Sequence, residues 1–309
     1  MPAASICRPP GIVTCGSGPN PAGFPGLHTL RRRPLRLLAL ALTAALTLPA
    51  MAVAQTLPAL PTLDETPAQR TARRAAMTPP VPQEDAALQA AVASPARPAA
   101  DVARDVYRHP FETLTFWGLT PASTVVEIEP GRAGWWRNIL EPYAAATGGT
   151  YVPVNRPLEG MGVDDGTADM VVVARAFHNW HRAGRTDAYL AAFFKALKPG
   201  GVLAIEQHRS AEGLNPDQTA PTGYVPESHV IRAAVAAGFV LDARSELNAN
   251  PKDDHDHPYG VWTLPPTRVS APREGNANDR PTPLTEAERA TFDAIGESDR
   301  MTLRFRKPA

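Results

Sequence analysis

Cysteine is nearly absent from this sequence of 309 residues, and its absence limits the possible chemistry. The only two cysteines, Cys7 and Cys15, lie close to the N-terminus. If the N-terminal segment is removed, the remaining chain holds no disulfide, no thiol nucleophile and no thiolate ligand for a metal ion. Several classes of enzyme that depend on cysteine are thereby excluded.

The sequence also has no excess of charge of either sign. The sequence has 31 Lys and Arg against 31 Asp and Glu, which gives a formal net charge of zero. No overall field therefore favours nucleic acid or an anionic membrane as a partner. The Gly-x-Ser-x-Gly turn of the α/β-hydrolases is missing. So is the Gly-x-Gly-x-x-Gly fingerprint of nicotinamide enzymes, which makes that class a weaker hypothesis.

The N-terminal region has the three parts of a secretory signal. Three arginines at positions 31–33 precede a short apolar run, residues 37–48, which is too short to span a bilayer as a stable helix. Small residues at 52–54 then supply a cleavage site before Gln55. The alternative is an N-terminus that is rich in Ala and Leu by coincidence. We predict that residues 1–54 are an N-terminal extension with a signal peptide and that the protein is exported to the periplasm. It would be cytoplasmic if the leader is not used.

Proline is abundant, with 34 residues concentrated in the first hundred positions and again near 265–283. Residues 55–83 combine Pro, Ala, Thr and Arg without any period, which predicts a flexible linker. Residues 84–309 are then expected to form one folded domain. We expect no integral membrane segment in the chain once the signal is cleaved.

Short apolar strands alternate with helical patterns through this domain. The expected strands are 124–128, 151–154, 169–174, 202–206, 239–244 and 301–306, and the expected helices after the first strand are 135–146, 186–197 and 228–237. This alternation predicts an α/β fold with a mostly parallel, doubly wound sheet. In such sheets a tight turn from a strand into a helix is where nucleotide-like ligands bind.

Two motifs carry a resemblance to class I S-adenosylmethionine-dependent methyltransferases. The turn Lys198-Pro199-Gly200-Gly201 stands before a strand, and the acidic Glu127 stands before a glycine-containing loop that ends at Gly134. More narrowly, the chain resembles a family of bacterial predicted methyltransferases that often carry signal peptides and whose substrates are mostly unassigned. Its further motifs here are Arg97-Pro98 with Asp101 and Arg104-Asp105, Pro130-Gly131, His178-Asn179-Trp180, and residues 296–301 with 305–308.

The resemblance implies a Rossmann-like sheet with a final antiparallel strand, S-adenosylmethionine as cofactor and a small-molecule acceptor. It implies a site at the carboxyl ends of strands one, two and four of the family pattern, with cofactor binding by Glu127, Glu129, Gly131, Gly134, Asn155 and Arg175. His178 lies where the acceptor would bind and is the candidate general base. Glu127 could equally be a buried carboxylate that caps the following helix, and His178 could simply cover a strand end.

Three departures from the family pattern are visible. Glu129 and Ala133 occupy the first and third glycine places of the loop, and Asn155 replaces the acid that ends the second strand. The segment between Asn155 and Asp169 is too short for a strand and a helix, which predicts a shortened or lost third strand. A non-catalytic ligand-binding protein on a degenerate scaffold is therefore the alternative function.

The segment 253–257 reads Asp-Asp-His-Asp-His and suggests a metal site, because carboxylate and imidazole suit several divalent cations. Neighbouring residues of an extended loop point in alternating directions, however, so few of them can share one ion. A solvated polar loop is the preferred interpretation, with no metal among the predicted ligands. A metal-dependent enzyme that joins this loop to His178 or His181 is the further alternative.

Overall fold

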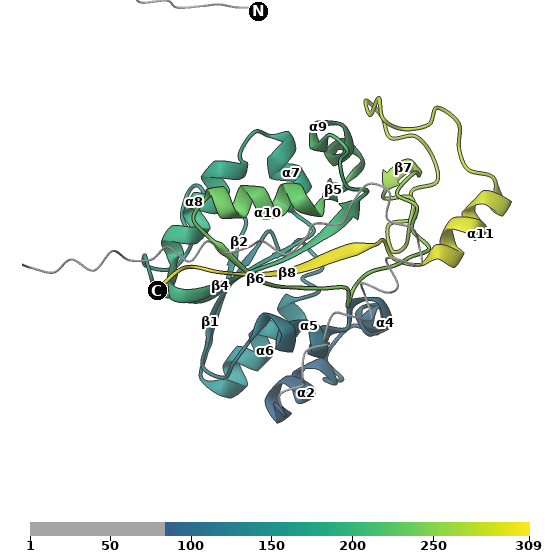
Figure 1. Ribbon diagram of the computed structural model, residues 1–309. Coiled ribbons are helices and arrows are strands. Elements are labelled where there is room, and N and C mark those ends of the chain that lie inside the picture. The colour runs from purple at the N-terminus through teal and green to yellow at the C-terminus, as the bar shows by residue number, and fades with distance from the viewer. Residues whose placement is uncertain (1–83) are drawn as a thin grey trace, which may run out of the picture. The chain divides into compact units, whose positions relative to one another are not determined.

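The computed structural model describes residues 84–309, and its centre is a mostly parallel β-sheet (Figure 1). The strands along the sheet follow the order β2-β1-β3-β4-β8-β6. Their bounds are β1 (Thr124–Ile128), β2 (Thr150–Val154), β3 (Ala168–Ala174), β4 (Leu197–Ser210), β6 (Val240–Ser245) and β8 (Arg300–Arg306). The signal peptide and linker predictions, and both cysteines, lie outside the described residues.

The first four strands of this order run parallel, whereas β8 is antiparallel to both of its neighbours. A short strand, β5 (Val225–Pro226), pairs in parallel with the end of β4. This is the Rossmann-like fold of class I methyltransferases, so the predicted fold class is confirmed. Strand β1 pairs with β2 on one side and β3 on the other, which puts a topological switch point at its carboxyl end.

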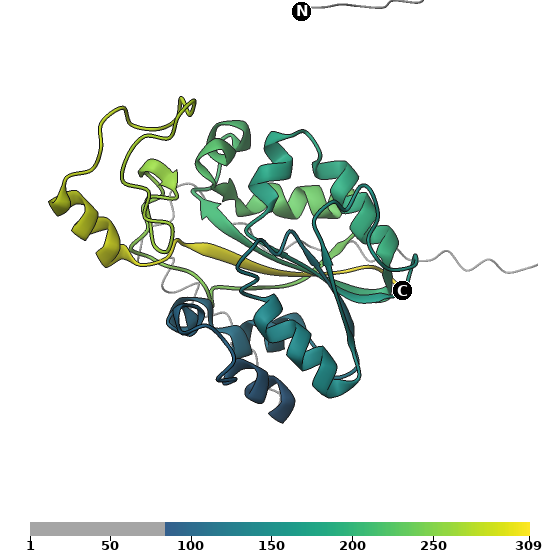
Figure 2. The ribbon, with the colours of Figure 1, turned by 180° about the vertical axis from the view of Figure 1, so that it is seen from behind.

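Helices cover both faces of the sheet, as the two opposite views show (Figures 1 and 2). One face carries α2 (Ala86–Val92), α5 (Pro110–Trp117) and α6 (Arg137–Thr147), while the other carries α7 (Phe177–Arg182), α8 (Thr186–Ala196) and α10 (Glu227–Ala236). Strand residues alternate between the two cores. Val125 and Val172 pack with the first set of helices, and Val126 and Val171 pack with the second.

The third strand of the family pattern is missing from the described part of the chain. Between β2 and β3 the chain forms a loop, and no strand pairs with the outer edge of β2. Met161 from this loop is buried in the core cluster that includes Val154, and Gly162 packs closely on the side chain of Val152. The loop therefore covers apolar surface that a helix would otherwise bury, and the expected loss of the third strand is confirmed.

Smaller elements complete the domain. They are α3 (Ala99–Val102), α4 (Asp105–Arg108), α9 (Pro216–Thr219), the 3-10 helix η1 (Ala220–Thr222), β7 (Pro258–Val261) and α11 (Glu286–Ile295). Helix α11 begins with a complete capping box, in which Thr285 and Glu288 satisfy each other's backbone amides. Among residues 84–309, no helix has the length and apolar character needed to cross a membrane.

Candidate active site

The loop after β1 turns on three residues with left-handed backbone angles. These are Glu129 (φ 51°), Gly131 (φ 68°) and Gly134 (φ 57°). Ala133, which stands at the third glycine place of the family pattern, does not have a positive φ, whereas the next residue, Gly134, does. Only Glu129 departs from glycine at a position that favours glycine. The loop therefore keeps the backbone path of a ligand-binding turn better than its sequence indicates.

The space around two of these loop residues, Gly131 and Gly134, bears on how a ligand could approach the loop. A Cβ added to the exposed Gly131 would meet no atom within 4 Å. A Cβ on Gly134 would lie 2.6 Å from the guanidinium of Arg137, so glycine is what lets this arginine lie against the loop. The sequence analysis did not single out Arg137. Asn155 lies exposed at the end of β2, as predicted.

Glu127 is buried near the end of β1, with 2% of its surface exposed. Its Oε2 accepts a 2.7 Å hydrogen bond from the Tyr151 hydroxyl of the neighbouring strand β2. Burial raises the pKa of Glu127 to about 7, and the Tyr151 hydrogen bond and the charges of Arg175 and Arg137 only partly oppose this. Glu127 is thus a carboxyl poised between its neutral and ionised forms. It faces β2 and does not cap helix α6, whose N-terminus has no side-chain cap.

A cavity of about 300 Å³ opens at the carboxyl ends of β3 and β4. Arg175 follows β3 in a left-handed conformation (φ 58°) and donates from Nη1 to Glu206 Oε2 at 2.8 Å. Burial lowers the pKa of Arg175, although the charge of Glu206 opposes that change. Arg175 lines the cavity, and its charge also lowers the pKa of Glu127, so it is near enough to both to influence them. Its predicted place at the site is consistent with this position, while its contact with a cofactor stays a prediction.

Charged side chains from the two ends of the domain meet at the same cavity. Glu297 accepts from Arg104 Nε at 2.6 Å and from Arg108 Nε at 2.9 Å. Arg300 contacts both Glu297 (2.5 Å) and Glu206 (2.7 Å). Arg104, Glu297 and Arg300 were predicted only as parts of motifs that carry the resemblance, Arg108 was not singled out, and no contact among these side chains was predicted. The available signal was that two separate charged motifs, near 104 and near 300, both belonged to one pattern.

His178 also lines the cavity, but its chemistry differs from the prediction. It is buried, with 4% of its surface exposed, and its Nδ1 lies 3.3 Å from Gln207 Nε2. Burial lowers the pKa of His178 to about 4, and the charge of Arg182 acts in the same direction. The ring is therefore neutral at pH 7 and a weaker base than an exposed histidine. Because the Gln207 amide donates to Nδ1, the ring proton lies on Nε2, so the neutral ring is suited to donate a hydrogen bond to a substrate in the cavity. Its proposed role as a general base remains a prediction.

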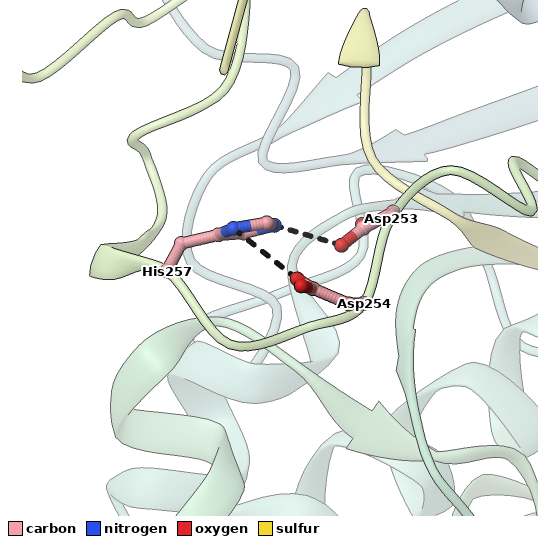
Figure 3. Close-up of side chains that lie close together, drawn as sticks. All are labelled: Asp253, Asp254 and His257. Atoms are coloured by element: carbon pink, nitrogen blue, oxygen red, sulfur yellow. Dashed lines mark hydrogen bonds and ion pairs between the residues drawn. The ribbon is translucent and has the colours of Figure 1, made fainter. Parts of the chain in front are cut away.

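The Asp253, Asp254 and His257 side chains lie close together in the loop before β7 (Figure 3), with potential ligand atoms within 4.8 Å of one another. The protein's own donors already occupy Asp253. Its oxygens accept hydrogen bonds from the Tyr224 hydroxyl, the amides of His255 and Asp299, and His257 Nε2 at 2.8 Å. This arrangement fixes the loop to the start of β8 and leaves Asp253 without a free lone pair directed at an ion.

We therefore expect the protein, purified without a histidine tag, to carry no stoichiometric divalent metal, and elemental analysis measures this directly. The control is the same measurement on Asp253→Asn, which removes the charge but keeps the shape. Stoichiometric metal in the unmodified chain that is lost in Asp253→Asn would instead support the metal-dependent alternative.

Comparisons with known proteins place this geometry within a fold. No family model matches the sequence, and no curated protein matches it. Solved structures do match. Geranyl diphosphate C-methyltransferase from Streptomyces coelicolor A3(2), solved with Mg²⁺, geranyl diphosphate and S-adenosyl-L-homocysteine, is 15% identical (TM-score 0.39) over 71% of this chain and 87% of that chain. An S-adenosylmethionine-dependent methyltransferase from Mesorhizobium loti is 13% identical (TM-score 0.35), over 67% and 98%.

A third similar structure is the [4+2]-cyclase SpnF, with 13% identity and a TM-score of 0.39 over 68% of this chain and 82% of that chain. At these identities the similarity concerns the fold alone. The function therefore has to be argued from the residues of the site.

Proposed function

We propose that this protein is an S-adenosylmethionine-dependent methyltransferase that acts on a small-molecule acceptor. The observation that carries the proposal is the loop after β1, where Glu129, Gly131 and Gly134 hold left-handed angles at the topological switch point of the sheet. Ligands of open α/β sheets bind at this point. The buried Glu127 one residue before the strand end completes the arrangement.

The residues around the loop fit the parts of S-adenosylmethionine. Glu127 would face the amino group, Arg137 and the amides near Gly131 would face the carboxylate, and Asn155 would hydrogen-bond the ribose hydroxyls. Such a cofactor, when bound, supplies a methyl group on a positively charged sulfur. The protein's own task is then to hold the acceptor in line and to exclude water. The cavity lined by Arg175 and His178, at the next strand ends, is the site we assign to the acceptor.

Export and this cofactor make opposite demands, since S-adenosylmethionine has to be available in the compartment where the protein works. We propose the periplasm as that compartment on the strength of the N-terminal pattern alone. The loop supports the non-catalytic alternative less strongly than its sequence suggested, because Glu129, Gly131 and Gly134 all keep left-handed backbone angles.

The test is calorimetric titration of the full chain with S-adenosylmethionine and S-adenosylhomocysteine. We expect micromolar binding of both, and we expect Gly131→Trp to weaken it at least tenfold, because the indole would fill the open space above the loop. Gly148→Trp is the matched control. Gly148 (φ 74°) is also exposed and also open around its Cβ position, but it lies at the other end of helix α6.

Equal affinity in both variants would show that ligand binding does not involve this loop. No binding by a folded sample at millimolar ligand would instead favour the non-catalytic protein on a degenerate scaffold.

A further inference from the structure

The cavity beside the loop carries an excess of positive charge. Glu297 is the one carboxylate among its described lining residues, and the fully buried Glu206 lies behind it. Against these two negative charges stand four guanidinium groups, from Arg104, Arg108, Arg175 and Arg300. The two histidines of the lining do not add to or offset this charge. Burial lowers the pKa of His178 to about 4 and that of His208 well below its ordinary value.

One of these guanidinium groups is incompletely satisfied. Arg108 is buried, with 2% of its surface exposed, and packs on the ring of Trp135 at 4.8 Å from the ring centroid. Its Nε donates to Glu297, but its Nη1 is buried and has no hydrogen-bond partner within residues 84–309. A buried cationic donor without an acceptor is costly, and an anion in the cavity would supply the acceptor.

Part of the cavity lining is apolar. It is formed by Val261, Trp262, Pro265 and Pro266. Arg273 places its guanidinium 4.3 Å from the ring centroid of Trp262 and so helps to hold this indole in place. A ligand of the cavity therefore meets both guanidinium groups and apolar surface, including the indole of Trp262.

We propose that the methyl acceptor is a small organic acid, and that the arginine cluster binds its oxyanion while the Trp262 side receives its apolar body. This inference rests on the proposed function. Guanidinium forks recognise carboxylate and phosphate oxygens with paired, charge-assisted hydrogen bonds. Arg175 follows β3, the strand that pairs with β1, so the anionic end lies next to the loop assigned to the methyl donor.

The experiment measures binding of benzoate, benzamide and phenyl phosphate to the full chain, with and without saturating S-adenosylhomocysteine. Benzamide has nearly the same shape as benzoate but no charge. We expect benzoate or phenyl phosphate to bind at least tenfold more tightly than benzamide. The stronger of the two identifies the oxyanion as carboxylate or phosphate.

Two substitutions test the assignment to the cluster. Arg104→Gln should weaken binding of the anion about fivefold to tenfold, whereas Glu297→Gln should strengthen it, because it removes the negative charge that competes with the ligand. Arg280→Gln is the matched control, since Arg280 also pairs with a carboxylate, Glu288, but does not line the cavity. A thermal melt of each variant confirms that it is folded.

The outcomes separate this inference from the proposed function. Binding of S-adenosylhomocysteine with equal or undetectable binding of benzoate, phenyl phosphate and benzamide would overturn the anionic acceptor and leave the methyltransferase standing. Anion binding that depends on Arg104, without any binding of S-adenosylhomocysteine, would support the anion site and overturn its role as an acceptor site. Anion binding that is unchanged in Arg104→Gln would overturn the assignment to this cavity.

Discussion

Replacing Arg209 with methionine is expected to lower the free energy of unfolding by about 3–5 kcal/mol, because it removes the cation that pairs with three buried carboxylates. Arg209 lies in β4 and is 7% exposed. It donates two hydrogen bonds to Glu246 at 2.8 Å, two to Asp299 at 2.9 and 3.0 Å, and one to Glu227 at 3.1 Å. Burial opposes ionisation of Asp299, but Arg209 and His255 hold the pKa of this carboxyl well below its usual range.

Chemical denaturation measures this effect, and Arg306→Met is the control. Arg306 pairs with Asp242 on the same sheet, but its side chain is 44% exposed, so its loss is expected to cost at most about 1 kcal/mol. Arg209→Lys should fall between the two, because it keeps the charge and loses the fork. A loss below about 1 kcal/mol for Arg209→Met would contradict the stabilising role that we give to this network.

The second large effect is a pH dependence of stability that originates at Glu127. Its pKa in the folded protein is about 7, against an ordinary value of 4.5, so the native state holds this proton where the unfolded chain has lost it. The contribution of Glu127 to stability is therefore full below about pH 4.5 and is lost as the pH rises through 7. The size is on the order of 3 kcal/mol over this window. Denaturation curves of the wild type and Glu127→Gln between pH 4.5 and 7.5 measure it as their difference.

The same carboxyl should make cofactor affinity depend on pH, if it faces the amino group as we propose. An ammonium group binds the ionised carboxylate, so affinity for S-adenosylhomocysteine should rise about tenfold between pH 5.5 and 7. Glu127→Gln should lose this dependence. A flat profile in the wild type would show that Glu127 is a structural carboxyl alone, held by Tyr151.

Strands β1 and β3 were predictable because each is a short, largely buried run rich in β-branched or apolar residues, whereas β4 is longer than its predicted 202–206 and β5 and β7 were not predicted. The expected 124–128 agrees with β1, and 301–306 differs from β8 by one residue. The helices α8 and α10 also lie within one residue of their predicted bounds. Helix α7 was not predicted, because residues 177–182 have no apolar period and are held by packing of Phe177 and Trp180 on the core. Helix α11 was missed although its capping residues, Thr285 and Glu288, were readable.

Some residues of the site were also predictable from the sequence, and others were not. Glu127, Gly131 and Asn155 were placed correctly at strand ends because their positions follow from local sequence. The third left-handed residue of the loop is Gly134, which was among the predicted site residues, and not its neighbour Ala133 at the third glycine place of the family pattern. The arginine cluster joins Arg104 to Glu297 across 193 residues, a contact that only the completed sheet creates. No periodicity in one sequence can predict a contact of that kind.

Within residues 84–309 no strand pairs with the outer edge of β2, so another chain could add a strand to the sheet at this edge. Pro153 restricts this risk. Val154 accepts from Glu129 and Thr150 donates to Ser123, both on the β1 side, so the backbone groups of Pro153 point outward along the alternating strand. A proline there removes one of the outward donors, as is typical of strands that have to stay unpaired. Pro153 therefore disfavours association of two chains through the edge of β2.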